Sequence, residues 1–273
     1  MALTSLQHKH FLALLFVGMA ITITSCERDR MEMKANTIGI ESSTAENLFA
    51  DMFNVVDNVS SSTPGIREEE FGCIDTIIAD TVAFPRTLLI DFGNDNCVGA
   101  DGRARNGQIQ VTYTGRYRET GTVITMTTNN YTVNGYLVAG THTVTNLGPS
   151  IEGQLVYSVE VDGEITAPDN AWSSTWQSNR TRIWIEGQNT PTIWDDVYNI
   201  TGSTSGINRN DVYYEANITV PLRAEVGCRW IVSGAVLIQP EGMAVRTIDF
   251  GNGECNNGIT VTVNGHTTSY GTE

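Results

Sequence analysis

Residues 108–114 read Gln-Ile-Gln-Val-Thr-Tyr-Thr, and this stretch decides the fold. Polar and apolar side chains alternate in it without a break, so one face of an extended strand meets a core and the other meets water. The same period of two returns near the other end of the chain, in residues 259–264. Asn-Gly or Asp-Gly pairs at 134–135, 162–163 and 264–265 tolerate the positive φ angles of tight hairpin turns. These patterns predict antiparallel strands joined by hairpins.

Alternating runs continue over most of the chain after residue 71. The runs 172–186 and 212–225 are long for single strands, and roughly a dozen strands fit at the usual spacing of strands and turns. We therefore predict a mostly β protein of long antiparallel hairpins, with residues 43–273 as a single domain. Periodicity does not decide between one large sheet and a sandwich.

One short helix is predicted before the strands, over residues 43–58. Residues 43–46 read Ser-Thr-Ala-Glu, the capping-box pattern in which the first and fourth side chains satisfy each other's backbone N–H groups. An apolar stripe from Leu48 to Val56 follows at helical spacing. The stripe predicts packing on the β domain, with a partner-binding helix as the alternative.

The chain repeats one motif near its two ends. Ile-Asp-Phe-Gly-Asn occurs at 90–94 and again at 248–252, and each copy has a cysteine six residues after its aspartate. A Gly-Cys pair opens each unit, at 72–73 and at 227–228. We infer two equivalent units, about 72–115 and 227–265, each closed by its own disulfide, Cys73–Cys97 and Cys228–Cys255. The alternative is cross-pairing, with Cys73–Cys228 and Cys97–Cys255.

The N-terminus has the pattern of a lipoprotein signal. Lys9 precedes an apolar run, residues 11–23, which is too short to span a bilayer as a helix. Residues 23–26 read Ile-Thr-Ser-Cys, which resembles the lipobox at which bacterial signals are cut and the cysteine is acylated. We therefore expect removal of residues 1–25, acyl chains on Cys26 and a flexible tether over 26–42. An ordinary cleaved signal is the alternative.

Several segments are similar to an uncharacterised lipoprotein family of Bacteroidota, especially of flavobacteria-like groups. They are the two Ile-Asp-Phe-Gly-Asn units and residues 114–117, 194–198, 205–210 and 228–234. The resemblance covers nearly the whole mature chain. It implies an exported protein held at the outer membrane by its lipid, on the periplasmic or the surface face, and it implies no activity.

Composition limits the chemistry. Residues 1–25 hold one base and no acid, so their removal changes the formal charge from −15 to −16, which argues against nucleic acid as a partner. The mature chain has two histidines, His142 and His266, and the patterns around both predict surface positions on strands. A three-histidine zinc site therefore cannot be built, and Cys-x-x-Cys pairs are absent. We expect neither a metal nor a cofactor.

The best candidate for a binding face lies in the run 172–194. Trp176, Arg180, Arg182 and Trp184 fall at even steps along one predicted strand and so share a face. On an exposed face they would stack on sugar rings or hold a polar partner. The structural interpretation is favoured over this one: the tryptophans cover the edge of the core and the arginines pair with acids.

The remaining motifs favour structural roles. Asp-Phe-Gly at 91–93 and 249–251 spells the kinase magnesium motif without any other kinase motif, and predicts strand ends with turns. The loop 94–102 is rich in Asn and Asp but lacks EF-hand spacing, which favours a turn over a calcium site. The acids at 68–70 and 195–196 are expected to be solvated charges. Thr76 and Thr81, each between an aspartate and a branched apolar residue, resemble the O-glycosylation signal of Bacteroidota.

These observations predict a non-enzymatic lipoprotein of the envelope that acts by binding or as structure. The first alternative is a glycan-binding accessory protein that uses the face of Trp176, Arg180, Arg182 and Trp184. The second is a carboxylate-dependent hydrolase of glycans or peptides. The expected partners are the membrane, through acyl chains on Cys26, and a glycan or a protein.

Overall fold

The computed structural model describes residues 37–57, 59, 74–80, 82, 84–192 and 194–271. Its strands form one antiparallel sheet of fourteen strands, which confirms the mostly β prediction and decides for a single large sheet. The strands are β1 (Thr76–Asp80), β2 (Arg86–Asp91), β3 (Cys97–Val98), β4 (Ala104–Tyr113), β5 (Val123–Val133), β6 (Tyr136–Pro149), β7 (Leu155–Thr166), β8 (Ser173–Glu186), β9 (Val197–Ile207), β10 (Tyr213–Glu225), β11 (Ile231–Pro240), β12 (Arg246–Asn252), β13 (Ile259–Val263) and β14 (His266–Tyr270). A short 3-10 helix, η1 (Pro168–Asn170), precedes β8. Cys26, Cys73, Thr81 and residues 68–70 lie outside the described residues.

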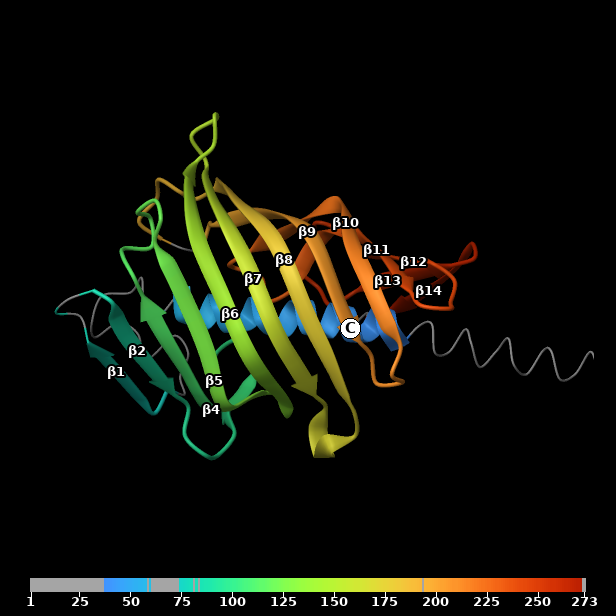
Figure 1. Cartoon of the computed structure of the whole chain (residues 1–273), viewed down its shortest axis with the longest axis horizontal. Helices are drawn as coiled ribbons and strands as arrows, with labels where there is room; N and C mark the ends of the chain where they lie inside the picture. The colour runs from blue at the N-terminus through green and yellow to red at the C-terminus, as the bar shows by residue number, and fades with distance from the viewer. Residues whose placement is uncertain are drawn as a thin grey trace, which may run out of the picture.

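Strand order in the sheet follows chain order, with β3 alone off the path beside β4. The sheet is strongly twisted and curved, and a helix crosses its inner side (Figure 1). The turns predicted at 134–135 and 264–265 are confirmed, with φ angles of +51° at Asn134 and +50° at Asn264. The turn predicted at 162–163 is wrong, because these residues lie inside β7 and pair with strands on both sides. β7 therefore continues through an Asp-Gly pair that usually marks a hairpin turn.

Part of the curvature comes from irregular strand pairing. Between β4 and β5 the register shifts between Asn106 and Gln108, and Gly107 has a φ angle of +78°. A Cβ atom at Gly107 would lie 2.1 Å from the backbone carbonyl oxygen of Asn130, so only glycine fits there. Bulges of this kind increase the local twist and bend the sheet.

The helix is already formed at residue 37 and continues through residue 57. The predicted helix start at Ser43 is therefore wrong, and so is the extension of the predicted tether over residues 37–42, whereas residues 26–36 lie outside the described residues. Ser43 lies inside the helix, where its backbone carbonyl accepts a hydrogen bond from the Asn47 side chain. Glu46 pairs with Arg180 on the sheet instead of serving a cap. Within the described ranges, no helix has the length and apolar character needed to cross a bilayer.

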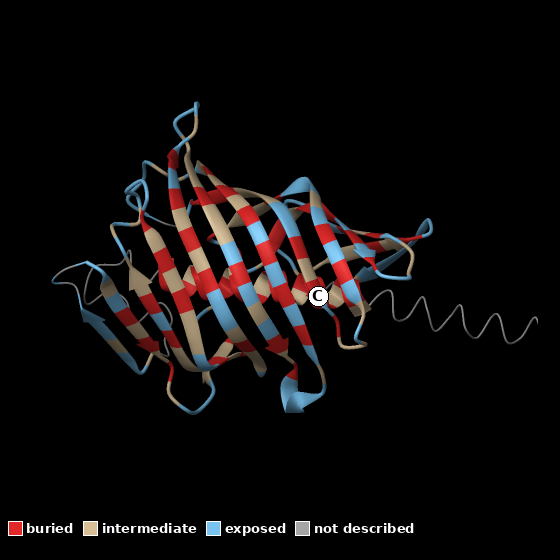
Figure 2. Cartoon of the chain, in the orientation of Figure 1, coloured by how far each residue is buried: buried red, intermediate tan, exposed pale blue. Residues whose placement is uncertain are grey.

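The curved sheet surrounds most of the helix. Figure 2 shows buried and exposed residues alternating along the strands, and the buried set faces the helix. Ile38 packs with β10–β13, whereas helix residues from Ala45 onward pack with β2–β9. A stripe of Ile40, Thr44 and Asn47 stays half-buried on the remaining side. The helix thus runs across the strands and joins two groups of core residues.

The two repeat units lie in opposite parts of the sheet and share a local arrangement. In each, the aspartate carboxylate accepts a hydrogen bond from the backbone N–H two residues later, at 2.8 Å for Asp91 and 2.7 Å for Asp249. The phenylalanine that follows is buried in both units. The first motif ends β2 as predicted, while β12 continues to Asn252.

The disulfides agree with one of the two predicted arrangements. Cys228 is bonded to Cys255, which confirms this pair and excludes cross-pairing. Cys97 is also disulfide-bonded.

Candidate functional site

The four residues of the predicted binding face all lie on β8 and share one side of it, as their even spacing requires. That side is the inner one, and Trp176, Arg180, Arg182 and Trp184 are all buried. The alternative of an exposed binding face is therefore wrong in this structure. The observed contacts agree with the favoured structural interpretation: both tryptophans join the core, and Arg180 pairs with Glu46.

Side chains of the helix cover this face. The Phe49 ring stacks on Trp176 with 5.1 Å between centroids. Arg180 donates a hydrogen bond to the Glu46 carboxylate at 2.7 Å and another to the Thr204 hydroxyl. The Arg182 guanidinium lies 4.1 Å from the centroid of Phe53, and such a cation–π contact gains strength when water is excluded.

Further acids of the helix bind arginines of the sheet. Asp51 pairs with Arg103 at 2.5 Å and with Arg105 at 2.7 Å, and all three side chains are buried. Burial alone would lower the pKa of Arg105, but Asp51 and Asp101 outweigh burial and raise it. Glu41 pairs with Arg209 near the other end of the helix. The helix and the inner face are therefore matched in charge along the helix axis.

Two titratable residues near the C-terminal part of the helix are buried against expectation. His142 is not on the surface: it lies against Phe53, and burial, with the charge of Arg182, lowers its pKa to about 3. Asp196 is not a solvated charge: it is 1 % exposed, and burial, with the charges of Asp57 and Asp195, raises its pKa to about 7. Asp195 itself is exposed as predicted.

A carboxyl group with a pKa near 7 has the value that a general acid needs. Neither carboxylate oxygen of Asp196 is reached by solvent, however, so a substrate has no access to it in this structure. We therefore expect the raised pKa of Asp196 to affect the stability of the fold.

The other predicted residues lie at the surface or in turns. His266 is exposed on β14 as predicted, and Thr76 is exposed on β1. Asn94, Asp95 and Asn96 are exposed, while Asp101 pairs with Arg105. In the part of the chain that the structure describes, no three His, Cys, Asp or Glu side chains are grouped to hold a metal ion.

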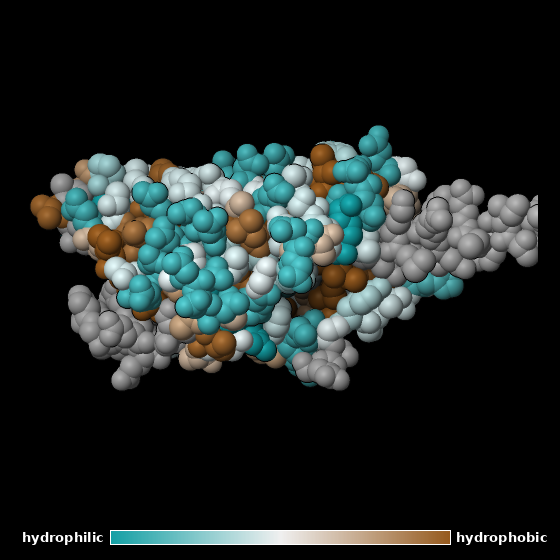
Figure 3. All heavy atoms as spheres, turned by 90° about the horizontal axis from the view of Figure 1, so that it is seen from below, coloured by the Kyte–Doolittle hydropathy of each residue, from teal (hydrophilic) through white to brown (hydrophobic). Residues whose placement is uncertain are grey.

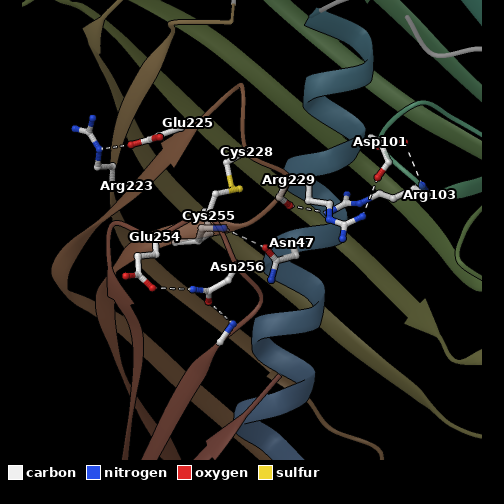
Figure 4. Close-up of a disulfide and its surroundings, with 12 residues drawn as sticks. Asn47, Asp101, Arg103, Arg223, Glu225, Cys228, Arg229, Glu254, Cys255 and Asn256 are labelled. Carbon is white, nitrogen blue, oxygen red and sulfur yellow. Dashed lines mark hydrogen bonds and ion pairs between the residues drawn. A yellow bond between two sulfur atoms is a disulfide. The ribbon is translucent and has the colours of Figure 1, made fainter. Parts of the chain in front are cut away.

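The segment that leads from β10 into β11 crosses the half-buried side of the helix. We call this segment, residues 226–231, the strap. The Cys228–Cys255 disulfide joins the strap to the loop after β12 (Figure 4). Toward the other end of the sheet, Arg103 donates to the backbone carbonyl of Arg229 at 2.6 Å, and Arg229 donates to the backbone carbonyl of Asp101 at 2.8 Å. The strap therefore links distant parts of the sheet across the helix.

A cleft of about 330 Å³ lies beside the strap, between the helix, the β5–β6 turn and residues of β11–β14. Three half-buried aromatic side chains line it, together with four side-chain amides and an apolar floor. These are Tyr136, Trp230 and Tyr270, then Asn47, Asn134, Asn256 and Asn257, and in the floor Leu48, Val133, Ile231, Phe250 and Ile259. The guanidinium carbons of Arg103 and Arg229 lie 5.3 and 5.2 Å from the ring centroid of Trp230, which holds this ring in place.

The cleft lacks catalytic groups among the described residues. Arg103 is the one charged side chain in its lining, and Asp51 neutralises it. Ser43 and Thr44 supply hydroxyl groups, but the lining holds no histidine, carboxylate or cysteine that would activate them. The arrangement suits contact and hydrogen bonding, not acid–base or nucleophilic chemistry.

Sequence reasoning missed this cleft. Trp230 stands in a segment that carries the family resemblance, and Asn134 stands in a predicted turn, but neither pattern marks a binding residue. The aromatic and amide residues come from the helix, the β5–β6 turn, the strap, the loop after β12 and the last strand. Only the curvature of the whole sheet brings them together.

Searches among protein families, characterised proteins and solved structures find no match to this chain. Seen from below the view of Figure 1, the described surface is largely hydrophilic, and apolar side chains form small separate patches (Figure 3). The cleft is thus interpreted from its own geometry.

Proposed function

We propose that the protein is a lipid-anchored envelope protein that acts by binding, and that the cleft beside the strap takes a short neutral saccharide. The observation that supports this proposal is the cleft lining of three aromatic rings and four amides around an apolar floor. Aromatic rings pack on the C–H faces of sugars, and amides donate and accept hydrogen bonds with hydroxyl groups. The volume of about 330 Å³ lies at the lower end of the range for ligand pockets, about 300–1,000 Å³.

Charge favours a neutral ligand. The protein as a whole is strongly acidic, so anionic ligands are repelled at a distance. Inside the cleft, the Arg103 charge is already taken by Asp51, and no carboxylate is present to attract a cation. The remaining groups of the cleft, its aromatic rings and side-chain amides, suit neutral molecules that are rich in hydroxyl groups.

The experiment is a glycan array followed by calorimetry on the glycans that bind. Trp230→Ala should weaken binding by about tenfold or more, because a buried aromatic anchor of a binding site is typically worth at least that much. Trp194→Ala is the matched control, since Trp194 is 46 % exposed and does not line the cleft. Both variants need unchanged thermal unfolding for the comparison to count.

Several results would contradict this proposal. They are an array without any bound neutral glycan, equal weakening by both tryptophan variants, and turnover of the glycan. Loss of binding with a stably folded Trp184→Phe variant would instead place the ligand on the inner face.

The location rests on the sequence before Cys26. Each buried methylene of an acyl chain contributes about 0.8 kcal/mol, so two or three chains hold a protein stably at a membrane. Labelled palmitate should enter the wild-type protein and should not enter Cys26→Ala. Protease treatment of whole cells then decides between the periplasmic and the surface face of the outer membrane.

O-glycosylation at Thr76 and Thr81 stays a prediction. The exposure of Thr76 on β1 leaves it accessible to a transferase. Added hexose mass on the native protein, lost on substitution of these threonines, is the result that would support it.

A further inference from the structure

We propose that a cavity between the helix and the inner face of the sheet binds a small monovalent anion, a halide or a short carboxylate, with Arg182 as its main partner. The cavity has a volume of about 60 Å³ and is lined by side chains of the helix, β6–β10 and the strap. It is separate from the cleft of the proposed saccharide, although Asn47, Trp230 and Ile231 border both. The proposal does not rest on saccharide binding.

Arg182 is a buried arginine without an acid partner. Its guanidinium carbon lies 4.1 Å from the ring centroid of Phe53 and 3.5 Å from that of Tyr198. Ring contacts favour the charge but accept none of the hydrogen bonds that a guanidinium donates in its plane. The Nε atom has no hydrogen-bond partner among the described residues. Asp57 and Asp196 act electrostatically on Tyr198, but neither lies within ion-pair distance of Arg182.

Three further buried side chains of the lining have polar atoms without a partner in the described part of the chain. Arg180 bonds through Nη2 alone, which leaves Nε and Nη1, and the same holds for Nε1 of Trp176, Oγ of Ser178 and both nitrogens of His142. His142 is neutral, because burial, with the charge of Arg182, lowers its pKa to about 3. Apart from Ser178 and one nitrogen of His142, these groups are N–H donors. Buried polar atoms nearly always have partners, so these donors indicate an acceptor in the cavity.

The charges of the lining favour an anion over water alone. Its two acids, Glu46 and Glu225, each already form an ion pair with an arginine. Arg182 and Arg229 remain, and neither has an ion pair with an acid of the described ranges. A buried charge is costly until a counter-charge meets it. A single negative charge beside Arg182 would therefore be bound, even though the protein as a whole is acidic.

The volume limits the ligand to a few atoms. An apolar cavity of about 150 Å³ holds one benzene molecule, so the smaller volume here suits chloride, formate or acetate. Phe49 and Val161 supply apolar wall for the methyl group of a short carboxylate. Ala50, Asn54 and Glu225 of the lining are only half-buried, so a small ion has an entrance between the helix and β10.

The test measures thermal unfolding while gluconate, which is too large for the cavity, is replaced by chloride, formate or acetate at constant ionic strength. A ligand that binds only the folded state raises the unfolding midpoint in a saturable way. We expect such a rise with at least one of the three anions, and the largest rise distinguishes a halide site from a carboxylate site. If none of them gives a saturable rise, water fills the cavity and the proposal is overturned.

Arg182→Met removes the charge and keeps a side chain of similar length. It should fold, because replacing buried charges by apolar side chains of similar volume is often neutral or stabilising. It should weaken anion binding by at least about tenfold, since hydrogen bonds to charged groups are the strong ones. Arg118→Met is the matched control: Arg118 lies 4.4 Å from the ring centroid of Trp184, but it is exposed and does not line the cavity. An anion response that survives in Arg182→Met, or that both variants lose, overturns the proposal.

If Arg182→Met does not fold, crystals of the wild type decide. They are grown with the anion that gave the largest rise, and bromide replaces chloride because its anomalous scattering identifies it. Density for the anion within hydrogen-bond distance of the Arg182 guanidinium supports the proposal. A cavity that holds only water under these conditions overturns it.

Discussion

The inner and outer faces of the sheet share the same strands and backbone hydrogen bonds, yet their side chains differ almost completely. On β8, Trp176, Arg180 and Trp184 face the helix, while Gln177 and Asn179 between them face outward. Strand pairing places one outward residue from each strand in a row that crosses the sheet from β2 to β14, and none of these residues is buried. The row is Thr87, Thr112, Thr125, Thr143, Glu160, Asn179, Ser203, Asn217, Leu237, Thr247, Thr262 and Thr267.

This difference shows which interactions hold the side chains of each face in place. Small polar and β-branched residues suit a pleated surface without needing a partner, so the backbone ladder alone organises the outer face. The inner face buries arginines and large aromatic rings, which need the acids and rings of the helix. Equal substitutions on the two faces should therefore have very unequal effects.

The largest effect is expected from Asp51→Ala on the inner side. This change leaves Arg103 buried without its acid and leaves Arg105 with Asp101 alone, and breaking a buried pair costs about 3–5 kcal/mol of unfolding free energy. Asp162→Ala on the outer face should cost less than about 0.5 kcal/mol. Urea unfolding of both variants measures the contrast, and equal losses would remove the distinction between the faces.

The second largest loss of unfolding free energy is expected when the disulfide of the strap is removed. Replacing Cys228 and Cys255 by serine opens a loop with a sequence separation of 27 residues, which corresponds to about 3.5 kcal/mol in the chain-entropy model. The loss should appear in thermal unfolding together with weaker ligand binding, because Trp230 lies in the strap. A variant as stable as the wild type would show that the strap does not depend on its disulfide.

Asp196→Asn should stabilise the protein in a defined pH window. The folded protein keeps the Asp196 proton up to about pH 7, whereas the unfolded chain releases it near pH 4, so ionisation penalises the folded state increasingly between these values. The asparagine variant avoids this penalty, and we expect a gain of about 1–3 kcal/mol at pH 8 that disappears near pH 3.5.

His142 acts in the opposite direction, because its pKa of about 3 in the folded state adds stability as the pH rises to about 6.5. Comparing the Asp196→Asn variant with the wild type at each pH cancels the His142 contribution. A gain that is independent of pH would contradict the assignment to the Asp196 proton.

The smallest effect is expected on the outer row. Asn179→Ala lies one residue from Arg180 but points to solvent, and should change the unfolding free energy by less than about 0.5 kcal/mol. Circular dichroism melting of this variant beside Arg180→Ala gives the contrast within a single strand. A large loss at Asn179 would show that the outer face carries contacts of its own.

Local patterns predicted much of the fold because strand periodicity is a local property. The alternation in 108–114 identified β4, and the repeat predicted the aspartate turns and favoured the Cys228–Cys255 disulfide over cross-pairing. His142 could also have been placed correctly. It lies at even steps from Val138 and Val144, so the pattern put it on their buried face.

The remaining features depend on contacts between distant segments. Alternation along β8 showed that Trp176 and Arg180 share a face, but it could not show which face the helix covers. Glu41 and Ser43 resembled a tether and a cap because they are polar, whereas the sheet buries both and pairs Glu41 with Arg209. The cleft needs the curvature of the complete sheet, which no single segment encodes.

The order of elements has a mechanical consequence. In chain order the helix precedes every strand of the sheet. A force that acts on the domain through an anchor at Cys26 would therefore reach the helix before any strand. The ion pairs of Glu41, Glu46 and Asp51 are spaced along the helix axis and would share this load in shear. If Cys26 carries the proposed lipid, the domain is held at the membrane through a helix that the sheet largely surrounds, so a force on the lipid acts first on the centre of the protein and not on the edge of the sheet.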